Sequence, residues 1–358
     1  MSSSEAASPR SKTEELLARA ELAIARGLFN LPTTWKLRIS GRPPLEIDGA
    51  ALHPDMQLLL ATQRWRGVGT LWAPEVRVAR ANMREGATRY ADAPPVASVE
   101  NLEIPGPAGP LRARHYVPAG AGRAPLLVYF HGGGFTLGDL DTHDMPCRLL
   151  ARSAHAQVLS IDYRLAPEHP YPAALDDGHS ALRWARDHAA ELGADPQRIA
   201  LGGDSAGGNM STVIAIDCAH RGGPALRAQL MIYPPTDMAG TSPSRQLFGE
   251  GLALTRRDTD WFNEQYLQNV SADDPRVSPL RAKDLSGLPP ALIVTAGFDA
   301  LRDEGEAYAG ALRRAGNHVV SWRERGLLHG FVNYAGVSRE ARAAVERIGH
   351  ALGELLQS

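Results

Sequence analysis

The chain has 358 residues, of which 44% are apolar and 22% are charged, so it can form one large domain with an elaboration or two domains. Its formal net charge of -2 provides no basic field of the kind that attracts nucleic acid or an anionic membrane. No run approaches the roughly 18 apolar residues that cross a bilayer. We therefore expect a small-molecule partner, with no nucleic acid and no membrane insertion.

The first ten residues are rich in serine and alanine and include a proline, which predicts a mobile terminus without an apolar signal segment. Two cysteines, Cys147 and Cys218, are too few for a disulfide framework, and each lies in a helix-like stretch. We interpret both as reduced packing residues. These features together predict a cytoplasmic protein.

Residues 1–95 predict a mostly helical elaboration. Ser11 and Glu14 match a capping box, and apolar residues follow at helical spacing until Gly27, where the helix is expected to end. A second helix is expected from Asp55 to Trp65. Between these pieces the pattern is irregular.

From Val96 onward the pattern becomes regular. Residues 99–106 and 111–118 alternate like an antiparallel strand pair joined by a Gly/Pro turn. Short runs rich in Val, Ile, Leu and Ala then predict buried strands at 125–130, 156–163, 198–203, 228–234, 290–297 and 318–324. Helical patterns are recognisable at 173–192, 206–221, 303–315 and 338–356. The sequence thus predicts an α/β fold, with a mainly parallel central sheet and helices on both faces. Residues 238–270 form a longer excursion that is expected to help cover a site.

One glycine-rich stretch predicts a nucleophile. Residues 203–207, Gly-Asp-Ser-Ala-Gly, follow a predicted strand and precede a predicted helix, which is the context that a G-x-S-x-G nucleophile elbow requires. The turn lifts Ser205 out of the end of the strand in strained backbone geometry. Gly203 and Gly207 are small because larger side chains there would collide with the strand or the helix.

A serine hydroxyl needs a base, and the base needs an acid that orients it. Asp299 and His329 follow two late predicted strands in the order serine, acid, histidine, so both fall at the same sheet edge as Ser205. Asp303 and Glu304 are rivals for the acid, but they read as acids that favour the dipole of a helix start. The rival histidines, among them His143, read as surface or helix-face residues.

Three glycines follow the strand at 125–130. The stretch His131-Gly132-Gly133-Gly134 is typical of an oxyanion loop, in which backbone N–H groups approach the developing negative charge. The N–H of Ala206 is expected to supply a further donor. A phosphate-binding loop is the alternative, but no Lys-Ser or Lys-Thr pair follows.

These motifs resemble the bacterial esterases similar to mammalian hormone-sensitive lipase, within the α/β-hydrolase fold. The matching stretches are HGGGF with GD and THD at 131–144, DYRLAPEHPYPAALDD at 162–177, GDSAGGN at 203–209, DALRDEG at 299–305 and HGF at 329–331. They occur in family order across residues 100–358.

The resemblance implies a triad of Ser205, Asp299 and His329 and an oxyanion hole of Gly133, Gly134 and Ala206. It also implies that Gly132 shapes the loop, that residues 1–95 form a helical cap, and that residues 96–358 form the catalytic domain. The position after Asp299 is usually proline in the family and is Ala300 here, which predicts a looser acid loop. The stretch at 162–177 is expected to brace the site without a catalytic role.

The expected function is a serine carboxylesterase that hydrolyses short- to medium-chain acyl esters through an acyl-enzyme. This chemistry needs no cofactor and no metal. The alternatives are an amidase or specialised deacetylase with the same triad, and a non-catalytic ligand receptor on the same fold. Whether the chain is a monomer or a homodimer stays open.

Overall fold

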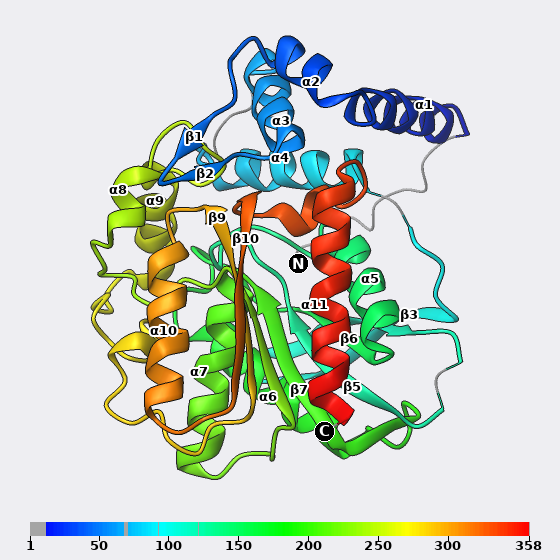
Figure 1. Cartoon of the computed structure of the whole chain (residues 1–358). Coiled ribbons are helices and arrows are strands. Elements are labelled where there is room, and N and C mark those ends of the chain that lie inside the picture. Colours follow the sequence, from blue (N-terminus) through cyan, green and yellow to red (C-terminus); the bar gives the residue numbers. More distant parts are fainter. Residues whose placement is uncertain (1–11, 68–70, 92, 121, 358) are drawn as a thin grey trace.

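The computed structural model describes residues 12–67, 71–91, 93–120 and 122–357 (Figure 1). The predictions of a mobile stretch over residues 1–10 and of a capping box beginning at Ser11 lie outside these ranges. One large sheet runs through the middle of the molecule, with helices on both faces (Figure 1). Further helices, from the N-terminal part of the chain, lie across one end of the sheet.

The central sheet has the strand order β10-β9-β8-β7-β5-β6-β4-β3. In chain order its strands are β3 (Ser98–Gly106), β4 (Gly109–Val117), β5 (Ala124–Phe130), β6 (Gln157–Asp162), β7 (Ala194–Asp204), β8 (Ala228–Ile232), β9 (Ala291–Phe298) and β10 (Val319–Leu328). Neighbours from β10 to β6 pair in parallel, whereas β4 pairs antiparallel with both β6 and β3. The predicted parallel sheet and the predicted antiparallel pair are both confirmed.

Helices cover the two faces of the sheet, which explains why strands such as β5 and β9 are buried along their whole length. One face is covered by α5 (Asp144–Ala154) and α11 (Arg339–Gln357), and the other by α6 (Ala173–Asp187), α7 (Ala206–Arg221) and α10 (Arg302–Arg314). In β5, Leu127 and Tyr129 pack toward α5 and α11, whereas Val128 and Phe130 pack toward α6 and α7. Successive side chains of a strand point to opposite faces, so both sets must be apolar.

Two helix ends differ from their predictions. Helix α1 (Lys12–Phe29) continues past Gly27, whose backbone does not adopt the left-handed conformation of a terminating glycine. Helix α6 ends at Asp187, before the predicted Leu192. The chain after α6 turns tightly, with the N–H of Leu192 bonded to the carbonyl of His188, to begin β7.

The N-terminal region contains more than the predicted helices. Its remaining elements are α2 (Thr33–Ser40), β1 (Glu46–Ile47), β2 (Ala50–Ala51), α3 (Pro54–Trp65) and α4 (Val76–Arg89). The helix expected at 55–65 is confirmed as α3. The hairpin of β1 and β2 was not predicted, although its turn residues Asp48 and Gly49 both have positive φ and form the Asp-Gly pair typical of such turns.

Arg80 of α4 attaches this region to the loops at the sheet edge. Its guanidinium donates to the carbonyl oxygens of Thr136 at 2.9 Å and Ala166 at 2.8 Å, and it pairs with Glu168 at 2.7 Å. Thr136 lies in the turn after β5, and the other two residues lie in the proline-rich stretch. A single side chain therefore fixes α4 against two loops.

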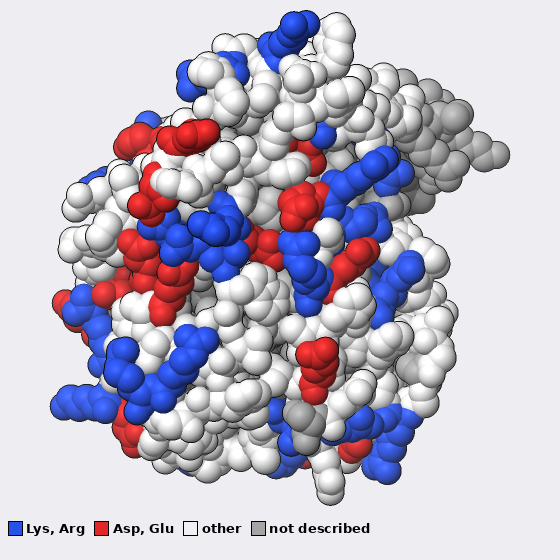
Figure 2. Space-filling view, viewed as in Figure 1, with Lys and Arg blue, Asp and Glu red and all other residues white. Residues whose placement is uncertain are grey.

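The excursion at 238–270 holds α8 (Pro243–Leu247) and α9 (Arg256–Leu267), and two short 3-10 helices, η1 (Pro279–Arg281) and η2 (Phe331–Tyr334), follow later in the chain. Among the helices of the described ranges, none has both the length and the hydropathy needed to cross a bilayer. Basic and acidic side chains are interleaved on the face of the molecule shown in Figure 2.

Candidate active site

Ser205 lies in the sharp turn between β7 and α7. Its φ of 51° and ψ of -120° are strained values for a residue with a side chain, as predicted for a nucleophile elbow. The N–H of Ser205 donates to the carbonyl of Ile232 at 2.8 Å, which holds the turn against the neighbouring strand β8. The strain is thus maintained by the surrounding sheet.

The glycines on either side of the elbow allow close packing against β5. A Cβ atom built on Gly203 or Gly207 would collide with the carbonyl oxygen of Phe130, the last residue of β5. Because the obstacle is backbone at the centre of the sheet, it cannot move aside cheaply. The requirement for small residues, predicted from the motif, is confirmed.

Gly207→Ala is therefore expected to reduce the free energy of unfolding by about 2 to 3 kcal/mol through overpacking. Gly27→Ala provides the control, since Gly27 lies inside α1 and nothing described lies within 4 Å of its added Cβ. That change should stabilise the protein by about 0.5 to 1 kcal/mol. Urea denaturation of both variants measures the two effects, and equal effects from the two substitutions would contradict the packing argument.

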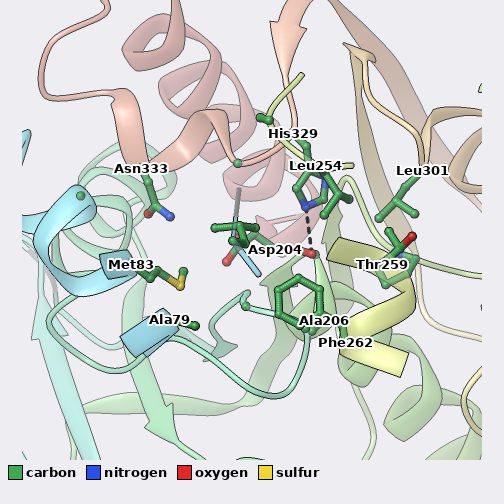
Figure 3. A pocket seen from close by; sticks show the side chains of 18 of the residues that line it. Ala79, Met83, Asp204, Ala206, Leu254, Thr259, Phe262, Leu301, His329 and Asn333 are labelled. Carbon is green, nitrogen blue, oxygen red and sulfur yellow. Dashed lines mark hydrogen bonds between the residues drawn. The ribbon is translucent and has the colours of Figure 1, made fainter. Parts of the chain in front are cut away.

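The structure brings Ser205, His329 and Asp299 together in one hydrogen-bonded chain. His329 Nε2 lies 3.0 Å from Ser205 Oγ, and His329 Nδ1 lies 2.8 Å from Asp299 Oδ2. The carboxylate can only accept, so Nδ1 carries the proton and Nε2 is left to accept from the serine. In Figure 3 a dashed line marks a hydrogen bond of the His329 ring, whose Nε2 is bonded to Ser205 Oγ.

The side chains of His329 and Asp299 are buried and held in place. Asp299 follows β9 and is 1% exposed, and its second oxygen, Oδ1, accepts from the N–H of Leu301 at 2.9 Å. The carbonyl of Ala300 accepts from the hydroxyl of Ser244 at 2.8 Å, so the acid loop is tied down without the proline usual in the family. His329 follows β10, with its ring 4.6 Å from that of Tyr233.

Backbone donors converge on the same place. Gly133, Gly134 and Ala206 line the cavity beside Ser205, and their N–H groups have no hydrogen-bond acceptor among the described residues. Gly133 and Gly134 have φ values of 121° and 60°, which residues with side chains rarely adopt. A Cβ on Gly134 would also strike the ring of Phe262. The glycines therefore serve both to shape the loop and to leave room for the wall of the cavity.

Asp204, the residue before the serine, fixes the glycine loop. Its buried carboxylate accepts from the N–H of Gly132 at 2.9 Å and from the hydroxyl of Tyr129 at 2.7 Å. Burial alone would raise the pKa of Asp204, but His143 and these hydrogen bonds together lower it to about 2. The prediction gave Asp204 no role, because the motif leaves its position unspecified.

His143 was interpreted as a surface or helix-face residue, and that interpretation is wrong. Its side chain is fully buried, with Nε2 3.3 Å from Asp204 Oδ1 and Nδ1 2.9 Å from the hydroxyl of Thr142. The ring also stacks on that of His131, with 5.5 Å between centroids. Its buried position depends on contacts far away in the sequence, so helical periodicity could not identify it.

Glu304 also does more than favour the dipole at the start of α10. Its carboxylate is buried, accepts from the N–H of Thr236 at 2.9 Å and pairs with Arg245 at 2.8 Å. Burial raises the pKa of Glu304 to about 7, although Arg245 acts in the opposite direction. Glu304 thereby anchors the chain segments after β8, one of which carries Arg245 to the cavity.

The stretch at 162–177 braces the loop beneath the site, as predicted. Tyr163 donates its hydroxyl proton to the carbonyl of His131 at 2.7 Å, directly before the three glycines. Arg164 forms an ion pair with the fully buried Asp177 at 2.8 Å. None of these side chains lines the cavity above Ser205.

That cavity lies between the N-terminal helices and the excursion at 238–270. Residues from α3 and α4 form one wall, and Met238, Leu254 and Phe262 of the excursion contribute to the other. The excursion therefore covers the site, as expected from its apolar content. Figure 3 shows Met83 of α4 and Phe262 of α9 reaching the same space from different sides.

Comparisons with known proteins identify the family of this chain and its relatives. Residues 127–333 match a family model described as alpha/beta hydrolase fold. The chain is 53% identical to the carboxylic ester hydrolase LipN of Mycobacterium tuberculosis over 85% of this chain and 83% of that protein. It is 42% identical to an ethyl acetate hydrolase of Pseudomonas putida over 67% of this chain and 75% of the relative.

Solved structures give the same result. An ester hydrolase from the metagenome of Lake Arreo, determined with a derivative of bipyridine phosphonate, superimposes with a TM-score of 0.82 and is 42% identical. The match covers 86% of this chain and 100% of that one. The chain belongs to the α/β-hydrolase family, among the bacterial esterases similar to hormone-sensitive lipase.

Proposed function

We propose that this protein is a serine carboxylesterase that hydrolyses short- to medium-chain acyl esters through an acyl-enzyme. The observation that carries the proposal is the unbroken hydrogen-bond chain from Ser205 through His329 to Asp299. Beside it lie the N–H groups of Gly133, Gly134 and Ala206, for which the described part of the chain provides no acceptor. The activities named for the relatives from Mycobacterium tuberculosis and Pseudomonas putida support it.

In the first half of the reaction, His329 Nε2 takes the proton of Ser205 Oγ as that oxygen attacks the acyl carbon. The carbonyl oxygen becomes an anion, and the N–H groups of Gly133, Gly134 and Ala206 stabilise it. Asp299 holds the imidazole in the required tautomer and stabilises its charged form. His329 then protonates the departing alcohol, leaving the acyl group on Ser205.

In the second half, a water molecule takes the place of the alcohol. His329 accepts a proton from the water as it attacks the acyl-enzyme, and the same N–H groups stabilise the second oxyanion. Collapse of this intermediate breaks the bond to Ser205 Oγ, which recovers its proton from His329. The products are a carboxylic acid and the free enzyme.

The division of the chain is part of the proposal. Residues 1–95 act as a cap over the cavity and residues 96–358 as the catalytic domain. Support for this comes from Gln63 and Met83, which line the cavity from α3 and α4, and from the contacts of Arg80 with the loops below.

The two other functions considered from the sequence remain distinguishable by experiment. An amidase would cleave anilides faster than the matching phenyl esters. A non-catalytic receptor would be expected to lose part of the hydrogen-bonded chain, which is intact here. We favour the esterase because the relatives are named for ester hydrolysis.

The proposed partner is a small ester, in the cytoplasm. Cys147 and Cys218 are both buried and unpaired, which supports a reducing compartment. A homodimer is the alternative to a monomer, and sedimentation equilibrium would decide between them.

A chain-length series tests the proposed function. Initial rates on p-nitrophenyl esters, from acetate to long acyl chains, are expected to peak at short or medium chains. Ser205→Ala, assayed in parallel, should lose all but a small residue of this hydrolysis. Absence of turnover by the folded wild-type protein on every ester would overturn the proposal, and a maximum at long chains would overturn its substrate range.

A further inference from the structure

The cavity above Ser205 has two unlike sides. Figure 3 shows Asn333 and Met83 on one side of the hydrogen bond between Ser205 and His329, and Leu301 and Thr259 on the other. We refer to the first as the Asn333 side and to the second as the Leu301 side. The Asn333 side is distinguished by one polar side chain, the amide of Asn333, that is not bonded to any described residue.

On the Leu301 side, polar side chains are engaged with their own chain. Thr259 donates its hydroxyl proton to the carbonyl of Arg256 at 2.8 Å. Two further polar residues of the cavity lining are also bonded: Arg245 pairs with Glu304 at 2.8 Å, and the amide of Asn263 donates to the carbonyl of Met238 at 3.4 Å. These groups are therefore occupied. A substrate meets mainly apolar surface on this side, which suits a hydrocarbon chain.

On the Asn333 side, an amide is available. Asn333 belongs to η2, one turn beyond His329, and its side chain points into the cavity toward Met83 (Figure 3). Its Oδ1 is buried and has no hydrogen-bond partner among the described residues. No described residue accepts from its Nδ2 either. A buried acceptor without a donor destabilises a folded protein, so a ligand that supplies a donor here gains affinity.

The chemistry of the amide defines the group that fits. An amide offers both an acceptor and a donor, and a hydroxyl can donate to the first while it accepts from the second. A methyl group or an ether oxygen cannot do both. The neighbouring side chains of Ala79 and Met83 on this side are apolar and offer no competing hydrogen bond to such a contact.

We propose that Asn333 is a specificity-determining residue, which selects esters that carry a free hydroxyl a few bonds from the ester group. This inference rests on the proposed esterase function and deepens it. The hydroxyl can belong to the alcohol, as in a monoester of a diol, or to the acyl group, as in a hydroxy-acid ester. Both sources present the same hydroxyl to the amide.

Two isosteric substrate pairs distinguish these sources. In the first, 2-hydroxyethyl butanoate is compared with propyl butanoate, and in the second, ethyl 3-hydroxybutanoate with ethyl 3-methylbutanoate. Each pair exchanges a hydroxyl for a methyl group at constant size. For each pair the measured quantity is the ratio of kcat/KM, hydroxylated over methylated, from proton release at constant pH.

The wild-type ratio is expected to exceed one in at least one pair, and Asn333→Leu should lower that ratio by about tenfold, the effect of one hydrogen bond. Asn333→Ala serves as a second variant if the Asn333→Leu protein does not fold. Asn263→Leu is the matched control, because it removes a cavity amide that is already bonded. Whatever its effect on the separate rates, it should change the ratio by less than about twofold.

The outcomes separate this inference from the proposed function. The role of Asn333 is overturned if the kcat/KM ratios are equal in the wild type and both Asn333 variants, or if the wild-type ratio is below one in both pairs. The proposed esterase function still stands in that case, provided that propyl butanoate is hydrolysed. If none of the four esters is hydrolysed, both the role of Asn333 and the proposed esterase function are overturned. If the Asn333 variants lower the kcat/KM ratio in one substrate pair only, the inference is supported, and that pair identifies which part of the substrate carries the hydroxyl.

Discussion

Ser205→Ala is expected to lower kcat for a soluble ester by about 10⁴-fold to 10⁶-fold, with the protein still folded. The hydroxyl of Ser205 is the only atom described within hydrogen-bonding distance of His329 Nε2, so its removal leaves the base without a proton to take. The residual rate reflects binding and the N–H groups of the glycine loop alone. Steady-state kinetics and the loss of labelling by an organophosphate measure the effect.

The triad should also behave as a unit. His329→Ala and the double variant with Ser205→Ala are each expected to lose about as much as Ser205→Ala, because each removes the same proton transfer. His179→Ala is a suitable control, since this histidine pairs with Asp217 away from the cavity and its loss should change kcat by less than about twofold. Labelling that persists at another serine in Ser205→Ala would show that the nucleophile lies elsewhere.

Asp204→Asn is expected to reduce the free energy of unfolding at pH 7 by about 2 to 3 kcal/mol. The pKa of Asp204 in the folded protein is about 2, below the unfolded value of about 3.9. Its ionised form therefore stabilises the fold above the unfolded pKa, and this stabilisation is lost as the pH falls through the folded pKa. The difference between wild type and variant should accordingly narrow from pH 5 toward pH 3, as measured by urea denaturation.

The same substitution should impair catalysis. The carboxylate of Asp204 holds the N–H of Gly132, so its loss lets the glycine loop shift and is expected to lower kcat by about 10-fold to 100-fold, with a smaller change in KM. Tyr129→Phe removes one hydrogen bond from Asp204 but keeps the carboxylate and the contact with Gly132. It should therefore cause smaller losses of both stability and kcat. A pH-independent stability difference in Asp204→Asn would refute the electrostatic argument.

The sheet and the central geometry of the site follow from local sequence patterns. Strands such as β5 and β9 are apolar on both faces because helices cover both, which makes them recognisable as continuous runs. Ser205, Asp299 and His329 come directly after the parallel strands β7, β9 and β10. Since parallel strands end at one edge, their spatial neighbourhood could be predicted from chain order alone.

The residues that support the site were not predictable in the same way. His143 and Glu304 each lie at the start of a helix, and that position is by itself enough to explain the residue type found there. Their actual partners, Asp204 and Arg245, lie about 60 residues away in the chain. Nothing in a single sequence states such a pairing. The free amide of Asn333 was missed for a related reason, because the short helix η2 carries no periodic pattern.

The order in which the three central side chains occur along the chain has a consequence for biosynthesis. On the ribosome Ser205 is made first and Asp299 later, and His329 is made only after β10, the last described strand of the central sheet. A nascent or truncated chain that ends before His329 carries the serine without its proposed base. Under the proposed mechanism, ester hydrolysis can therefore begin only after every described strand of the central sheet has been synthesised.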